Sequence, residues 1–229
     1  MKRLAIFVEG QTEQIFVTKL ITEMAGNKNI VIVQEQKIRG QNFVTIAAQK
    51  ITPDTKYYVL IRDCRNDTQV KTAIIDVAER FAERGYEKIL GLRDVYPKTH
   101  SEIPALVKWS NYQVPTKFLP IKILLAIMEI EAWFLAETSH FTRIHSSLTI
   151  DVIKSTLQLD PTVDSVELRP NPAKDLDDIY KKARFAYTKR KQNTIRTVNA
   201  LDYPSLYLSL RTRITSLNEF ISEIDLFLS

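Results

Sequence analysis

Three acidic residues stand just beyond short apolar runs, where they could act together on a metal ion. Glu9, Asp63 and Asp94 each follow such a run by one or two residues. Carboxylates at equivalent ends of neighbouring strands repel one another unless a cation lies between them. Mg²⁺ prefers hard oxygen ligands and keeps waters that leave room for a phosphate oxygen. The pattern therefore predicts a Mg²⁺ or Mn²⁺ site, although single acids are also common near helix N-termini because the helix dipole favours them.

The elements that must position these acids alternate between strands and helices. Predicted strands cover residues 4–8, 30–33, 57–61 and 88–92, and predicted helices cover residues 12–24, 43–51 and 70–81. This alternation predicts an α/β fold with an open, mostly parallel sheet of four to five strands flanked by helices. In such sheets ligands bind beyond the carboxyl ends of the strands, which is where the three acids fall.

The second half of the chain differs in composition from the first. All five glycines lie within the first 91 residues, so the architecture is expected to change downstream. A fifth strand near residues 118–123 and a helix near residues 126–136 complete a predicted α/β domain over residues 1–139. A helical C-terminal part is predicted over residues 140–229. Its expected helices cover residues 150–157, 175–187, 204–214 and 217–227.

The composition excludes several classes of protein. The chain has 229 residues, of which 45% are hydrophobic and 26% charged, enough to bury a sizeable core. The single cysteine, Cys64, excludes an internal disulfide framework and is compatible with a reducing cytoplasm. The longest apolar stretch, residues 121–134, is interrupted by Lys122 and two glutamates, so no membrane span is expected and a cytoplasmic location is predicted. The net charge of +5 permits nucleic acid as a partner without requiring it.

Three motifs, in order along the chain, resemble a known fold. They are FVEGQTEQIF (residues 7–16), IRDCRND (residues 61–67) and MEIEAWFLAE (residues 128–137). The first resembles the opening of the TOPRIM fold of topoisomerases, primases and overcoming-lysogenization-defect (OLD) nucleases. The set is most similar to the small TOPRIM-like proteins of bacterial defence and mobile loci, the DUF4276 and RloB-like group.

The resemblance implies roles for the acids of the first two motifs. Glu9 would be a metal-linked carboxylate that also acts as general base, and Asp63 the primary metal ligand, with Asp67 a further candidate. Glu13, in the first turn of its predicted helix, could face the same crevice or serve only as a charge that suits a helix N-terminus. Arg65 stands where the family carries its second aspartate.

The third motif adds two candidate metal ligands. Glu129 and Glu131 are two residues apart, so on a helix they point to different faces. At most one is expected to enter the site, unless the segment is extended. Alternatively, the two glutamates only supply negative charge at a helix N-terminus, where the helix dipole favours it.

Cations that could hold a phosphate backbone fall into two sets. One lies near the predicted strand ends: Arg62, Arg65, Arg93 and Lys98. The other is an acid-free run that contains Lys181, Lys182, Arg184, Lys189, Arg190 and Lys191. Phe185 and Tyr187, within this run, could stack on bases. A solvated helix end is the alternative, since cations complement the C-terminal dipole.

Other chemistries have little support. His100, His140 and His145 show no metal-ligand spacing, so packing or surface roles are expected. The chain has no Walker A motif and no G-x-G-x-x-G motif, so ATP or dinucleotide binding is not predicted.

We therefore predict a divalent-metal-dependent nuclease that hydrolyses phosphodiester bonds of DNA or RNA. The resemblance implies a bacterial defence or mobile-element setting and a separate ATPase subunit as a partner. The arginine at position 65 favours the alternative, a non-catalytic docking subunit of such an ATPase complex. Nucleotidyl transfer is a third hypothesis.

Overall fold

The computed structural model describes residues 1–38 and 42–229, without the side chains of Asp67 and Thr68. This part of the chain divides into two compact units. The first unit consists of Met1–Arg93, Pro104–Leu125 and Ser222–Ser229, and the second of Asp94–Ile103 and Ala126–Ile221. Each unit is therefore assembled from separate stretches of sequence. The predicted domain boundary at residue 139 stays a prediction.

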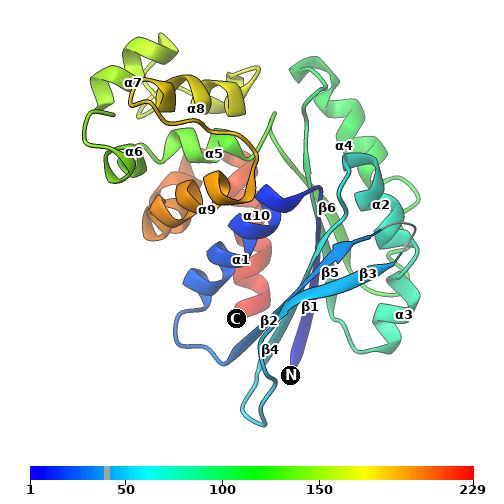
Figure 1. Ribbon diagram of the computed structural model, residues 1–229. Helices are drawn as coiled ribbons and strands as arrows, with labels where there is room; N and C mark the ends of the chain where they lie inside the picture. The colour runs from blue at the N-terminus through cyan, green and yellow to red at the C-terminus, as the bar shows by residue number, and fades with distance from the viewer. Residues whose placement is uncertain (39–41) are drawn as a thin grey trace. The chain divides into compact units, whose positions relative to one another are not determined.

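A mostly parallel sheet organises the first unit (Figure 1). Within the described residues its strands are β1 (Lys2–Val8), β2 (Ile30–Lys37), β3 (Phe43–Ala48), β4 (Tyr57–Asp63), β5 (Lys88–Asp94) and β6 (Ile121–Ala126). Their order across the sheet is β3-β2-β4-β1-β5-β6. Central β1 pairs in parallel with β4 and β5, and β2 pairs in parallel with β4. The α/β fold class is thus confirmed, with six described strands rather than four or five.

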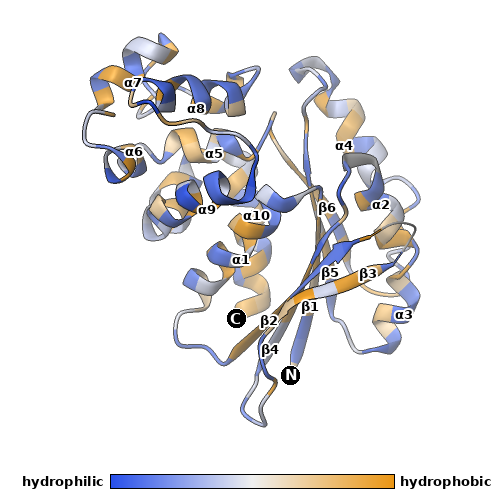
Figure 2. Cartoon of the chain, viewed as in Figure 1, coloured by the Kyte–Doolittle hydropathy of each residue, from blue (hydrophilic) through white to orange (hydrophobic). Residues whose placement is uncertain are grey.

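Helices cover both faces of this sheet. Figure 1 shows α1 (Gln11–Ala25) on one face and α2 (Asp67–Ile75) and α3 (Ala78–Glu83) on the other. In Figure 2, hydrophobic residues are prominent on α1. Residues 4–8 of β1 are all buried, because successive side chains point to opposite faces and each face is covered. The continuous apolar run of β1 is the sequence signal of that double burial.

The edge strand β3 corrects one prediction. Residues 43–51 were expected to be helical, but Phe43–Ala48 is a strand that pairs antiparallel with β2. The β-branched residues Val44, Thr45 and Ile46 suit a strand, and pairing with β2 supplies the hydrogen bonds that a helix would have made internally. Val44 and Ile46 stay exposed, so apolar burial does not fix this strand.

The second unit is helical in its longer stretch. Its helices are α5 (Glu131–Ala136), α6 (Ser139–Ile144), α7 (Ile150–Leu157), α8 (Pro172–Lys181) and α9 (Lys191–Ala200), with short turns at His100–Glu102, Val166–Leu168, Ser205–Ser209 and Leu210–Thr212. The last helix, α10 (Thr215–Leu228), contributes residues to both units, and α4 (Ile103–Asn111) lies almost wholly in the first. The helical C-terminal part is confirmed, and α7 has the predicted bounds.

Aromatic side chains fill the core of the second unit. Trp133 and Phe134 of α5 are fully buried, and Trp133 stacks on Phe220 with ring centroids 6.1 Å apart. The indole N–H of Trp133 donates to the Ser216 hydroxyl at 2.8 Å. Because α5 is anchored in this way, the residues at its start have a fixed direction. No helix in the described residues is long and apolar enough to cross a membrane.

Gly91 is closely packed against neighbouring elements. A Cβ atom at this position of β5 would lie 3.1 Å from side-chain atoms of Ile123 and Ile74 and 3.2 Å from Val70. These contacts are tighter than ordinary van der Waals distances, so the neighbours would have to move. A side chain here would therefore overpack the interface between β5, β6 and α2.

We predict that Gly91→Val lowers the free energy of unfolding by about 1–3 kcal/mol, because overpacking forces the core to shift. The measurement is urea denaturation followed by circular dichroism. Ala105→Val, on an exposed position of α4, is the control and is expected to stay within about 0.5 kcal/mol of the parent. Equal stabilities of the two variants would contradict the packing described for β5.

Candidate functional site

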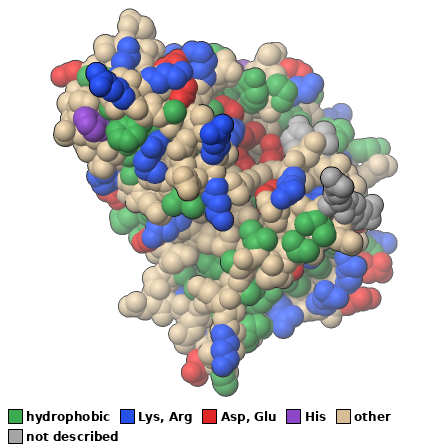
Figure 3. Space-filling view, in the orientation of Figure 1, with side chains coloured by type: hydrophobic (Ala, Val, Ile, Leu, Met, Phe, Trp, Pro, Cys, Tyr) green, Lys and Arg blue, Asp and Glu red, His purple; other side chains and the backbone are tan. Residues whose placement is uncertain are grey.

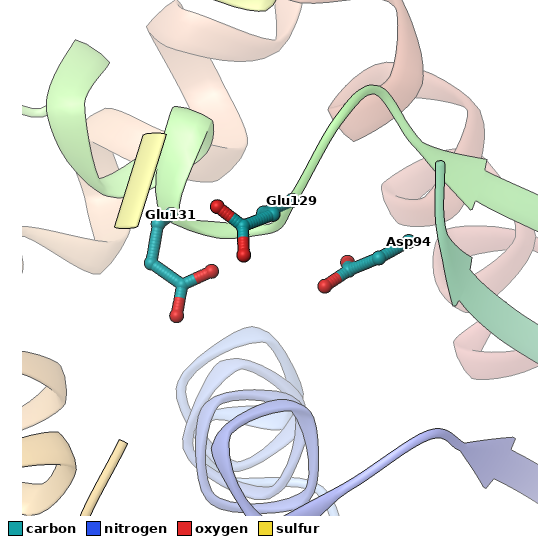
Figure 4. Close-up of side chains that lie close together, drawn as sticks. All are labelled: Asp94, Glu129 and Glu131. Atoms are coloured by element: carbon teal, nitrogen blue, oxygen red, sulfur yellow. The ribbon is translucent and has the colours of Figure 1, made fainter. Parts of the chain in front are cut away.

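Three buried carboxylates meet in the second unit. One oxygen from each of Asp94, Glu129 and Glu131 lies within 4.8 Å of the others, and all three residues are buried. In the described part of the chain, no other set of three His, Cys, Asp or Glu residues meets this criterion. Figure 4 shows Asp94 at the end of β5, Glu129 in the loop between β6 and α5, and Glu131 at the start of α5, with their carboxylates facing a common space.

Backbone hydrogen bonds hold the two loops of this acidic cluster together. The Val95 amide donates to the Ala126 carbonyl at 3.1 Å, and the Tyr96 amide to the Met128 carbonyl at 2.8 Å. Met128 itself has φ = 61°, a left-handed conformation that costs a non-glycine residue about 1–2 kcal/mol. The resulting tight turn, with the Glu129 amide donating to the Ile127 carbonyl at 3.0 Å, directs Glu129 toward Asp94. The strain is concentrated at the turn that forms the site.

Both glutamates of the third motif enter the cluster. At most one was expected, because a helix was predicted over residues 126–136. The structure instead has a turn at Met128, and α5 begins only at Glu131. Since Glu129 precedes the helix, the two side chains do not diverge as they would within one.

Backbone amides fix two of the three carboxylates. Asp94 Oδ1 accepts a hydrogen bond from the Ile130 amide at 3.2 Å. Glu129 Oε2 accepts one from the Ala173 amide at 2.9 Å. Ala173 lies in the first turn of α8, where amides lack partners within the helix and the dipole favours a negative charge. These hydrogen bonds fix the orientation of the Asp94 and Glu129 carboxylates.

Glu131 is the most strongly buried member of the acidic cluster. Its side chain is 0% exposed, and its Oε2 atom has no hydrogen-bond partner among the described residues. Burial raises the pKa of Glu131, and the charge of Glu129 raises it further, while Lys189 and Tyr187 lower it. A buried acceptor without a donor costs about 1–3 kcal/mol, so this oxygen is a candidate ligand atom for a cation.

Tyr187 and Lys189 complete the site from a distant stretch of sequence. The Tyr187 hydroxyl donates to Glu131 Oε1 at 2.8 Å. The Lys189 ammonium lies 2.9 Å from Glu129 Oε1 and 3.5 Å from Glu131 Oε1. This corrects the prediction that Tyr187 could stack on bases, since its ring is buried.

The end of α8 explains how these two residues reach the cluster. A helix was predicted to continue to residue 187, but α8 stops at Lys181 and Arg184 adopts a left-handed backbone with φ = 62°. The chain then runs without helix or strand up to α9. Alternating aromatic and basic residues were visible in this run, but nothing local in the sequence marks where the helix stops.

The predicted metal ligands in the first unit have other partners. Glu9 pairs with Arg93 at 3.4 Å. Asp63 is buried and accepts hydrogen bonds from the Gln36 side-chain amide at 2.9 Å and from the Arg65 backbone amide at 2.7 Å.

Two further candidate ligands complete this comparison. Glu13 is buried in the first turn of α1, and the side chain of Asp67 lies outside the described part of the structure. Of the predicted ligands, the structure therefore brings together Asp94, Glu129 and Glu131 within the second unit.

The predicted phosphate-binding cations near the strand ends are largely engaged within the protein. The Arg62 Nε donates to Glu35 at 2.7 Å, and its guanidinium lies 4.5 Å from the Phe43 ring centroid. Arg93 is buried, Lys98 pairs with Glu102 at 3.2 Å, and Arg65 is exposed with φ = 59°.

The basic run of the second unit is mostly exposed. Lys181 pairs with Asp177 at 2.6 Å, and Lys182, Arg184, Arg190 and Lys191 are exposed. Figure 3 shows the lysines and arginines of the second unit scattered over the visible face, with acidic side chains between them. On this face they do not form a continuous basic patch.

The three histidines make hydrogen bonds within the protein. His140 is fully buried, and its Nδ1 donates to the Glu137 carbonyl while Nε2 lies 3.1 Å from the Tyr180 hydroxyl. Burial lowers the pKa of His140 to about 3, so it stays neutral in the folded chain. His100 and His145 contact Glu167 and Ser147 respectively.

Comparisons with known proteins identify no family for this chain. No family model and no curated protein matches the sequence. Among solved structures, the chain is similar to "the putative cell surface hydrolase from Lactobacillus plantarum WCFS1", with 10% sequence identity and a TM-score of 0.35. The match covers 69% of this chain and 64% of that chain, less than two thirds of its length. A likeness this distant carries no argument about activity.

We predict that Lys189→Met lowers the free energy of unfolding in EDTA by about 1–2 kcal/mol, because it leaves two buried glutamates without their ammonium. Urea denaturation measures the change. Lys191→Met removes an exposed lysine of the same stretch and should cost less than about 0.5 kcal/mol. An unchanged stability of Lys189→Met would show that the ion pairs contribute nothing.

We also predict a pH effect from His140. Its pKa is lowered on folding, so its contribution to stability is complete above the unfolded pKa of 6.5 and is lost as the pH falls toward 3. Between pH 7 and pH 4.5 the parent should lose about 1–3 kcal/mol more than His140→Gln does. Urea titrations at several pH values test this, and parallel curves for the two proteins would refute it.

Proposed function

We propose that the chain is a divalent-metal-dependent phosphodiesterase that acts on DNA or RNA, with Mg²⁺ or Mn²⁺ held by Asp94, Glu129 and Glu131. The observation that carries the proposal is the buried Glu131 Oε2 atom, which has no hydrogen-bond partner among the described residues and belongs to a cluster of three carboxylates. Burying such an oxygen without a donor costs free energy unless a cation pairs with it.

The donor set suits a hard cation. Carboxylate oxygens are the ligands that Mg²⁺ and Mn²⁺ prefer, and three such residues leave positions for water or phosphate. A bound ion of this kind lowers the pKa of a coordinated water and offsets charge on a phosphate. No histidine or cysteine is needed for that chemistry, and none belongs to the acidic cluster.

The surrounding residues have defined tasks in this proposal. The Ile130 and Ala173 amides orient Asp94 and Glu129, and the Tyr187 hydroxyl orients Glu131. Lys189 neutralises the glutamates, and its side chain is 45% exposed. A long, partly exposed lysine can move its ammonium from a carboxylate to a phosphate oxygen without a change in the backbone.

The resemblance to TOPRIM-like proteins is compatible with this proposal but assigns the ligands differently. It implies Glu9 and Asp63 as ligands, whereas the cluster uses both glutamates of the third motif. We propose that the third motif holds the metal. A role in bacterial defence beside a separate ATPase subunit is part of the same proposal and rests on the resemblance alone.

One observation favours a second candidate function. Lys189 already supplies a positive charge to Glu129 and Glu131, so the cluster can exist as a buried ion-pair network. In that case the chain is a non-catalytic binding subunit. Metal binding separates the two candidates, because only the first requires it.

We predict that Glu131→Gln abolishes both Mn²⁺-dependent cleavage and the rise in melting temperature that Mn²⁺ causes in the parent. A ligand at 100 times its dissociation constant stabilises a protein by about 2.7 kcal/mol, which thermal denaturation detects readily. The cleavage substrates are labelled single- and double-stranded DNA and RNA. Asp94→Asn and Glu129→Gln should behave in the same way.

The control is Glu219→Gln, which removes an exposed acid from α10 and should leave both measurements unchanged. Glu9→Gln and Asp63→Asn are measured in parallel. If these two variants lose metal-induced stabilisation while Glu131→Gln keeps it, the metal site is wrongly assigned. If the parent binds no Mn²⁺, the ion-pair network replaces the enzymatic proposal.

A further inference from the structure

The end of α4 exposes an unusual set of aromatic and apolar side chains in the first unit. Trp109 is 46% exposed, Tyr112 is 59% exposed and Val107 is 47% exposed. In Figure 2 much of α4 is coloured as hydrophobic. Large aromatic rings on a surface are commonly contact residues for a ligand or partner.

One lysine joins the two aromatic rings. The ammonium of buried Lys71 lies 4.5 Å from the ring centroid of Trp109 and 5.9 Å from that of Tyr112. It also donates a hydrogen bond to the Trp109 carbonyl at 2.6 Å. Because both rings lie near the same ammonium, they are neighbours on the exposed side of α4 and of the residue that follows it, and we call this pair the Trp109–Tyr112 platform.

Basic residues lie around the Trp109–Tyr112 platform. The guanidinium of buried Arg93, which also pairs with Glu9 at 3.4 Å, lies 5.0 Å from the Trp109 ring centroid. The stretch Pro104–Leu125, which carries the platform, contains three lysines and no aspartate or glutamate, although Lys122 pairs with Glu223 at 3.0 Å. One of them, Lys108, is exposed next to Trp109. This charge complements a polyanion.

We propose that the Trp109–Tyr112 platform binds single-stranded nucleic acid by stacking bases on its two rings. Exposed rings beside cations are the combination that such binding requires, since the rings stack on base faces and the cations attract the phosphates. A duplex keeps its base faces inside the stack and cannot use the rings in this way. Only the purpose of the bound strand rests on the proposed function; the binding itself does not.

Binding is tested with the full chain and 5′-fluorescein-labelled 20-nucleotide oligonucleotides of DNA and RNA. Fluorescence anisotropy is measured in EDTA, so that cleavage and metal binding do not contribute. Trp109→Ala and Tyr112→Ala should each weaken single-strand binding about 5- to 100-fold. Leu226→Ala, which removes an apolar side chain that is 65% exposed elsewhere in the first unit, should bind as the parent does.

Tryptophan fluorescence gives an independent readout. The chain has two tryptophans, of which Trp133 is fully buried and Trp109 is exposed. Unlabelled single strands should quench the emission of the parent, and this quenching should vanish in Trp109→Phe. Circular dichroism checks that each variant is folded. If a Trp109 variant does not fold, Tyr112→Ala, at a highly exposed position, still tests the proposal.

The possible outcomes separate this inference from the proposed function. Parent-like binding by both alanine variants, or equal affinity for duplex and single strand without quenching, overturns the platform. Loss of self-association in Trp109→Ala with unchanged oligonucleotide binding also overturns it, in favour of a protein contact. If Glu131→Gln loses cleavage but still binds single-stranded oligonucleotides, both proposals are supported. If Glu131→Gln cleaves as the parent does, the proposed metal site is overturned and the platform is not.

Discussion

Mutual repulsion among three buried carboxylates is the constraint on which the second unit depends. Asp94, Glu129 and Glu131 approach within 4.8 Å in an environment where charges interact more strongly than in water. Such a group persists only if hydrogen-bond donors, cations or a bound proton reduce the repulsion. The Lys189 ammonium and the Tyr187 hydroxyl do so in part, and one Glu131 oxygen has no such donor among the described residues.

Several irregular features of the backbone follow from that constraint. The left-handed residue at Met128 turns Glu129 toward Asp94 and delays the start of α5 until Glu131. The first turn of α8 supplies an amide to Glu129. The early end of α8 then frees the stretch that carries Lys189. A regular helix through Met128 would have turned Glu129 away from Asp94. A longer α8 would have carried Tyr187 and Lys189 away from the acids.

Much of the fold and part of the site could be predicted from local sequence. The buried strands were predictable because both of their faces are covered, which requires a continuous apolar run such as that of β1. The edge strand β3 was not, because its conformation is fixed by pairing with β2 rather than by its own burial. Asp94 and the two glutamates were predictable as candidates, from strand-end position and motif. Their partner Lys189 was not, because it is 60 residues from Glu129 and its position depends on where α8 stops.

The discontinuous first unit also constrains the order in which the chain can fold. Glu223 pairs with Lys122 at 3.0 Å and also with Lys88, and the Tyr57 hydroxyl donates to the Leu228 carbonyl at 3.1 Å. During synthesis, most of the sheet leaves the ribosome long before these last contacts become available. The sheet must therefore wait for about one hundred later residues before its helical cover is complete. A fragment that stops after β6 would expose that surface, and it is a natural target for chaperones and proteases.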